Sequence, residues 1–267
     1  MRLLLTTIIL MATAVSATAH EYWFEADSFF LNKGQSMQLH LFVGEALKKD
    51  EERVYQAAKT TSFQMISPSG TFDMRTMADD DKSPILKFST EGTGTYLFSM
   101  VRNWSYITLD ADKFEAYLRD EGMDYIVAER KRIGESKKPG RERYSRFIKT
   151  AVQVGGNKTA SAMARVDSKL EIVPLNNPYS RKVGETLNVQ IRFDRRPLAN
   201  AAIFADNRNG DRITTQKVTT DADGKASIKL SSSGLWLIRL VYMQRCTIRC
   251  EGADWESFWG AFSFGLR

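Results

Sequence analysis

The sequence contains few of the residues on which most catalytic and metal motifs depend, with two cysteines and two histidines among 267 residues. So few cysteines exclude a disulfide-rich scaffold. The chain has no G-x-S-x-G motif, no H-E-x-x-H motif and no histidine beside a candidate nucleophile, so nothing supports hydrolytic catalysis. Collagen, heptad and solenoid periods are also missing. With 43% hydrophobic residues the chain is too apolar to be disordered, and we expect a folded core.

Long apolar runs are also scarce, and the single clear one lies at the start. Met1 and Arg2 precede an apolar stretch at residues 3–14, and the small residues at 16–19 end in Ala19. A basic start, a short apolar region and an A-x-A ending predict a secretory signal peptide cleaved after Ala19. No later run approaches the roughly 18 apolar residues that a membrane helix needs. We therefore expect a periplasmic protein that begins at His20 and has no integral membrane segment.

The charge balance is mildly positive, with 38 Lys and Arg against 32 Asp and Glu and a net charge of +6. The basic residues are mostly interleaved with acidic ones rather than gathered into patches, so we expect no nucleic-acid partner. The most basic stretch, residues 137–143, contains a Pro-Gly pair and a glutamate, which favours a solvated loop.

Short alternating segments separated by turn residues predict a mainly β protein with two antiparallel sandwich-like domains. The expected strands of the N-terminal β domain, residues 20–109, are 21–26, 36–43, 61–67, 85–89 and 95–102. Those of the C-terminal β-sandwich domain, residues 164–267, are 170–174, 186–193, 201–207, 211–219, 225–230, 235–242 and 259–266. Charged sequence with helical spacing between Asp110 and Lys149 predicts a helical insert over residues 110–163.

The two histidines are the candidate metal ligands. His20 would become the first residue after signal cleavage, and His40 lies in the strand expected at 36–43. An N-terminal histidine offers its α-amine and ring Nδ1 to one ion, and a second imidazole completes a three-nitrogen set that suits Cu(II) or Ni(II). The geometry requires the first two strands to pair. Copper is favoured chemically because it binds nitrogen sites most tightly among these ions.

Other interpretations of these residues stay open. The carboxylates near the two histidines could add oxygen ligands or be ordinary strand-end charges, and they are Glu21, Glu25 and Glu45. A copper-dependent oxidase could use the same three nitrogens, although we expect a binding protein rather than an enzyme. A sandwich module that binds a protein or a carbohydrate is a third possibility, because aromatic residues gather at 22–24, at Trp236 and at 255–264.

Two short motifs favour structural roles. Cys246 and Cys250 lie in a chain expected to be exported, so a disulfide closing a small loop is favoured over a metal-thiolate site. Asp221 and Asp223 precede Gly224, but the remaining ligands of a calcium loop are missing, which favours a turn.

Several segments together resemble the NikM-like family, a bacterial family of domains of unknown function associated with periplasmic components of cobalt and nickel uptake. The resemblance rests on residues 19–25 (AHEYWFE), 41–45 (LFVGE), 144–149 (YSRFIK), 196–201 (RPLANA), 220–224 (TDADG) and 234–238 (GLWLI). It implies a transthyretin-like or prealbumin-like C-terminal sandwich and a role in handling nickel or cobalt. It also implies His20 as a ligand and a membrane transporter component as a partner.

Overall fold

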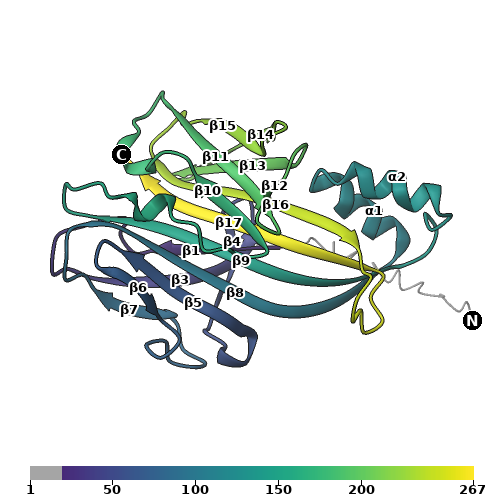
Figure 1. Cartoon of the computed structure of the whole chain (residues 1–267), viewed down its shortest axis with the longest axis horizontal. Coiled ribbons are helices and arrows are strands. Elements are labelled where there is room, and N and C mark those ends of the chain that lie inside the picture. Colours follow the sequence, from purple (N-terminus) through teal and green to yellow (C-terminus); the bar gives the residue numbers. More distant parts are fainter. Residues whose placement is uncertain (1–19) are drawn as a thin grey trace, which may run out of the picture.

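The computed structural model describes residues 20–267, so the expected signal peptide lies outside the described residues. Residues 20–267 are mainly β and sandwich-like, as predicted, and they form three sheets and two short α-helices. Figure 1 shows both helices at one end of the sheets, beside the ends of the longest strands. No helix among the described residues is both long and apolar enough to cross a membrane.

A nine-stranded sheet forms the centre of the molecule, in the order β14-β13-β16-β17-β9-β8-β5-β6, with β2 also paired to β9. Its strands are β2 (Phe30–Leu31), β5 (Thr60–Ser67), β6 (Gly70–Asp73), β8 (Gly94–Leu109), β9 (Gly140–Val154), β13 (Ala202–Asn209), β14 (Arg212–Thr219), β16 (Gly234–Arg245) and β17 (Trp255–Leu266). Most neighbours are antiparallel, but β17 runs parallel to β9. The central sheet therefore contains strands from both expected β domains.

Two smaller sheets cover the central one. The first contains β1 (Glu21–Ala26), β3 (Ser36–Glu45), β4 (Lys48–Arg53) and β7 (Leu86–Ser89). The second contains β10 (Leu170–Pro174), β11 (Thr186–Phe193), β12 (Arg196–Pro197) and β15 (Lys225–Lys229). Short 3-10 turns complete the chain at Ala57–Lys59, Ala160–Met163 and Pro178–Ser180.

The alternation of β9 explains why the central sheet has a core on each face. Successive strand side chains point to opposite faces. Ile148 and Val152 belong to the core cluster that also contains β1 and β3, whereas Phe147 and Ala151 belong to the cluster that contains β10 and β11. The two small sheets consequently pack on opposite faces of the central sheet.

The predicted helical insert is wrong for its second half. The helices α1 (Ala111–Asp120) and α2 (Asp124–Arg132) are present, but residues 140–154 form β9, near the middle of the central sheet. Two of its charged residues misled the prediction because they are buried in ion pairs rather than solvated. The Nζ of Lys149 lies 3.0 Å from Oε1 of Glu171, and Arg143 pairs with Glu256. The loop expected at 137–143 likewise ends at Gly140, where β9 begins.

Two smaller predictions are confirmed. Cys246 and Cys250 form a disulfide in the connection between β16 and β17. Residues 221–224 form a turn in which Oδ1 of Asp221 accepts hydrogen bonds from the amides of Asp223 at 2.9 Å and Lys225 at 2.8 Å. Gly224 has a φ of +69°, a conformation that glycine adopts without strain.

Candidate functional site

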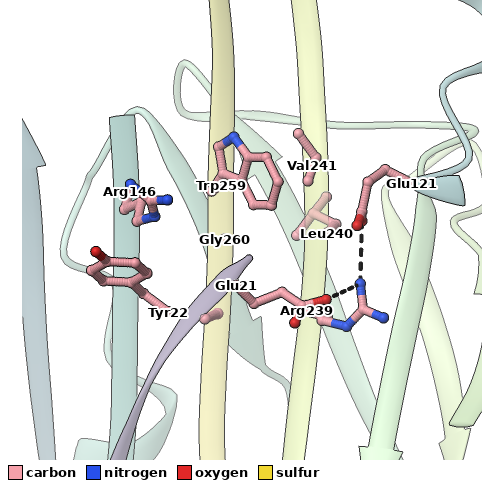
Figure 2. Close-up of a pocket in the computed structure, with 10 residues that line it drawn as sticks. Glu21, Tyr22, Glu121, Arg146, Arg239, Leu240, Val241, Trp259 and Gly260 are labelled. Carbon is pink, nitrogen blue, oxygen red and sulfur yellow. Dashed lines mark hydrogen bonds and ion pairs between the residues drawn. The ribbon is translucent and has the colours of Figure 1, made fainter. Parts of the chain in front are cut away.

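A cavity of about 220 Å³ lies where β1 crosses the central sheet near the helices. The residues around it come from β1 and the residue just before it, and from β3, β8, β9, β17 and α1. They are His20, Tyr22, Val43, Ile107, Leu109, Tyr117, Glu142, Tyr144, Arg146 and Trp259. A smaller adjoining pocket, shown in Figure 2, shares Tyr22, Arg146 and Trp259 with it.

Strand periodicity brings the polar groups of this cavity together. Glu142, Tyr144 and Arg146 are alternate residues of β9 and therefore project from one face of the sheet. Trp259 is paired with Arg146 across the parallel ladder of β17 and β9. Tyr22 reaches the cavity from the first small sheet, because its strand β1 packs against β9 and β17 of the central sheet.

Arg146 lies among aromatic rings. The centre of its guanidinium is 4.0 Å from the ring centroid of Tyr22, 4.6 Å from that of Tyr144 and 5.8 Å from that of Trp259. Such contacts hold a cation against the negative faces of the rings. One Nη of Arg146 donates a long hydrogen bond of 3.4 Å to the carbonyl of His20, while its buried Nε has no hydrogen-bond partner among residues 20–267.

A second arginine lies directly beside it. Arg102 on β8 is the cross-strand partner of Arg146 and is only 8% exposed. Its guanidinium lies 5.5 Å from the ring of Tyr22, which is the aromatic side chain that Arg146 also contacts. One Nη donates to Oε1 of Gln56 at 2.6 Å, and Nη1 has no partner in the described chain. Burial, then the charge of Arg146, lowers the pKa of Arg102.

Glu142 places a buried carboxyl in the same cavity. The Tyr117 hydroxyl donates to Oε1 of Glu142 at 3.2 Å, and the Ser257 hydroxyl donates to the same oxygen. Burial raises the pKa of Glu142 to about 7, although hydrogen bonds from Ser257 and Tyr117 and the charge of Arg146 act in the opposite direction. The cavity therefore contains a permanent cation and a carboxyl that is readily protonated near neutral pH.

The adjoining pocket contains a separate charge cluster around Arg239. Carboxyl oxygens of Glu21 and Glu121 lie 2.8 Å and 3.2 Å from Nη1 of this arginine (Figure 2), and Asp206 lies 2.7 Å from its Nε. Burial raises the pKa of Glu21 to about 8 and that of Glu121 to about 7. The guanidinium of Arg239 therefore pairs with carboxylates of the protein itself, whereas those of Arg102 and Arg146 do not.

The structure does not bring His20 and His40 together. β1 and β3 do pair, as the metal prediction required, but the register places His40 opposite Glu25. His20 precedes β1 and lies five positions before Glu25, a distance of about 16 Å along an extended chain. His20 lines the cavity with Tyr22, whereas His40 stacks on Phe42 and its Nδ1 lies 2.7 Å from Oε1 of Glu52.

The remaining predicted site residues are also dispersed. His20 has its Nε2 3.0 Å from Oδ2 of Asp50, but residues 20–267 hold no cluster of three His, Cys, Asp or Glu side chains suited to a metal ion. Glu25 pairs with Lys49 and Arg208, and Glu45 is exposed. The aromatic residues Trp23, Phe24, Trp236 and Trp255 are buried in cores, so no sugar platform is formed by them.

The sequence interpretation missed Arg146 and Tyr144 as site residues because their segment was assigned to the helical insert. The available signal was the spacing of Glu142, Tyr144 and Arg146 at every second position, which the charged residues Arg141 and Arg143 beside them obscure. Arg102 was placed at the end of an expected strand, but nothing in a single sequence indicates that two arginines pair across neighbouring strands.

Fold and cavity together define a mainly β, sandwich-like protein with a polar, aromatic-lined cavity between two of its sheets. The chain belongs to the family described as "Domain of unknown function (DUF4198)", whose model matches residues 17–244. No curated protein matches the chain.

Similarity to solved structures is weak. The chain is similar to the D0-D1 domain of intimin, with 12% identity, coverage of 91% of this chain and 97% of that one, and a TM-score of 0.22. It is similar to murine CEACAM1b with 8% identity, coverage of 92% and 99%, and a TM-score of 0.21. For three N-terminal domains of the outer capsid protein Hoc of bacteriophage RB49 the identity is 9%, the coverage 91% and 59%, and the TM-score 0.18. TM-scores this low do not support an inference about function.

Proposed function

We propose that this protein is exported and binds one divalent transition-metal ion at His20, in order to buffer the ion or deliver it to a membrane uptake system. The observation that carries the proposal is the position of His20, at the cavity, with its Nε2 held 3.0 Å from the Asp50 carboxylate. The resemblance to NikM-like proteins points to nickel or cobalt, whereas ligand chemistry favours copper.

The chemistry requires cleavage after Ala19, which would give His20 a free α-amine. The amine and ring Nδ1 of one histidine can then chelate an ion, and an unperturbed α-amine pKa near 8 allows deprotonation at modest cost. Asp50 contacts the other ring nitrogen. A carboxylate in that position orients a metal-bound imidazole and increases its basicity. His40 is left out of this site because of its strand register.

The proposal is tested by titrating Cu(II), Ni(II) and Co(II) into protein that mass spectrometry shows to begin at His20. We expect one ion per chain, with affinity in the order Cu(II), Ni(II), Co(II). His20→Ala, or one alanine added before His20, should abolish tight binding. Asp50→Asn should weaken it about tenfold, the usual effect of losing a carboxylate behind a ligating histidine.

His40→Ala is the matched control, because it removes the other histidine of the first small sheet. It should leave the affinity unchanged. An equal loss with His40→Ala and His20→Ala would contradict this site, and absence of binding at micromolar ion concentrations would reject metal binding altogether.

A further inference from the structure

We propose that the cavity beside His20 binds a small organic monocarboxylate with an apolar body, and that Arg146 holds its carboxylate. This inference is independent of the metal proposal, because it requires neither a metal ion nor a free α-amine. It rests on two neighbouring arginines that lack acidic partners and on the size and lining of the cavity beside one of them, Arg146.

Arg102 and Arg146 differ from two buried arginines of the same central sheet. Arg143 and Arg239 each pair with carboxylates of the protein. Arg102 and Arg146 lie opposite each other on β8 and β9, yet neither forms an ion pair with any carboxylate of residues 20–267. Two adjacent cations in a partly buried site repel each other, and an anion between or beside them removes that cost.

Both arginines also have hydrogen-bond donors without partners among residues 20–267. Nε of Arg146 and Nη1 of Arg102 are buried donors that lack partners in the described residues. A buried donor without a partner is costly, and charged donors are the most costly. Tyr22 and Tyr144 contact the Arg146 guanidinium through their rings and its Nε is closed to solvent, so the terminal Nη groups of this half-buried side chain are the part left for a ligand. A carboxylate matches such a pair of groups with two oxygens.

The lining and the size of the cavity suit a small acid with an apolar body. Val43, Ile107 and Leu109 provide apolar surface beside Arg146. The volume of about 220 Å³ exceeds the roughly 150 Å³ of a protein cavity known to hold benzene, so a single-ring acid or a short aliphatic acid would fit. Glu142 adds a buried carboxyl, which disfavours a ligand with a second negative charge.

Calorimetry or ligand-observed NMR with two acids and their amides tests the proposal, with EDTA present to exclude metal effects. The probes are benzoate and hexanoate, compared with benzamide and hexanamide, which have the same bodies without the charge. We expect at least one acid to bind, about tenfold more tightly than its amide. Arg146→Gln should abolish that preference, and succinate should bind more weakly than hexanoate.

Arg141→Gln is the matched control, because Arg141 is on the same strand but is exposed and paired with Asp254. It should bind the acids like the unmodified protein. Ile107→Trp, which fills the cavity and keeps Arg146, should also block binding, so the test does not depend on the folding of one variant. The proposal is overturned if neither acid binds at about 10 mM, if the amides bind as well as the acids, or if Arg146→Gln binds normally.

Discussion

Strand periodicity places two ionisable side chains, Glu142 and Arg146, at the same cavity. They lie four positions apart on β9, face the same cavity and are not in direct ion-pair contact. Glu142 instead accepts hydrogen bonds from Tyr117 and Ser257. A buried carboxyl group that accepts hydrogen bonds from neutral donors favours its protonated form more than a buried carboxyl group paired with a cation does.

The raised pKa of Glu142 predicts a pH dependence of stability. Between an unfolded value of 4.5 and a folded value of about 7, the folded chain keeps a proton that the unfolded chain has lost. The contribution of Glu142 is therefore fully present below pH 4.5, falls as pH rises to about 7 and is constant above that. Its size is on the order of 3 kcal/mol.

Glu142→Gln cannot ionise, so its free energy of unfolding should fall less between pH 5 and about 7 than that of the unmodified protein. Urea denaturation at several pH values measures this, with Glu91→Gln at an exposed position as control. An identical slope for Glu142→Gln and the unmodified protein would show that Glu142 does not retain its proton.

At the residue scale, the sequence identified Cys246 and Cys250 correctly because a short spacing in a chain expected to be exported restricts the alternatives. The pairing of His20 and His40 could not be judged in the same way. It depends on which residues of β1 and β3 lie opposite each other, and a shift of one position moves a side chain to the other face.

At the scale of elements, strands with a polar or turn boundary on each side were predictable, and β9 was not. The expected strands at 21–26 and 186–193 match β1 and β11. Alternation of apolar and polar residues identifies a strand with one solvated face. β9 has cores on both faces and carries its charges in buried pairs such as Lys149 with Glu171, so that pattern is lost.

The packing of α1 on the start of β9 leads to a prediction about Gly140. A Cβ at this position would lie 2.1 Å from the ring of Phe114, which is fully buried. Gly140→Ala should therefore lower the free energy of unfolding by about 1–3 kcal/mol, the usual cost of overpacking. Gly156→Ala is the matched control, since a Cβ there meets nothing within 4 Å. Equal stability of the two variants in urea denaturation would show that α1 moves aside freely.

At the scale of the whole molecule, the central sheet joins the two halves of the sequence. β8 and β5 come from the N-terminal half, β16 and β17 from the C-terminal half, and β9 connects them. The sandwich character was predictable from strand spacing. The shared sheet was not, because the parallel pairing of β17 with β9 joins segments more than a hundred residues apart.

The shared sheet predicts that the protein unfolds in a single step. Because β9 and β17 contribute to cores on both faces of the sheet, neither half can lose its structure without exposing apolar surface of the other. Tryptophan fluorescence and far-ultraviolet circular dichroism should give coincident urea transitions. Two separated transitions would instead show that residues 20–109 and 164–267 are independent folding units.

The position of β17 also has a consequence for biosynthesis. β17 separates β9 from β16, yet it is synthesised after both. Until residues 255–266 leave the ribosome, the growing chain has two unpaired strand edges and no complete central sheet. Such edges are templates for aggregation, so a nascent chain of this topology benefits from being kept unfolded until its synthesis is complete.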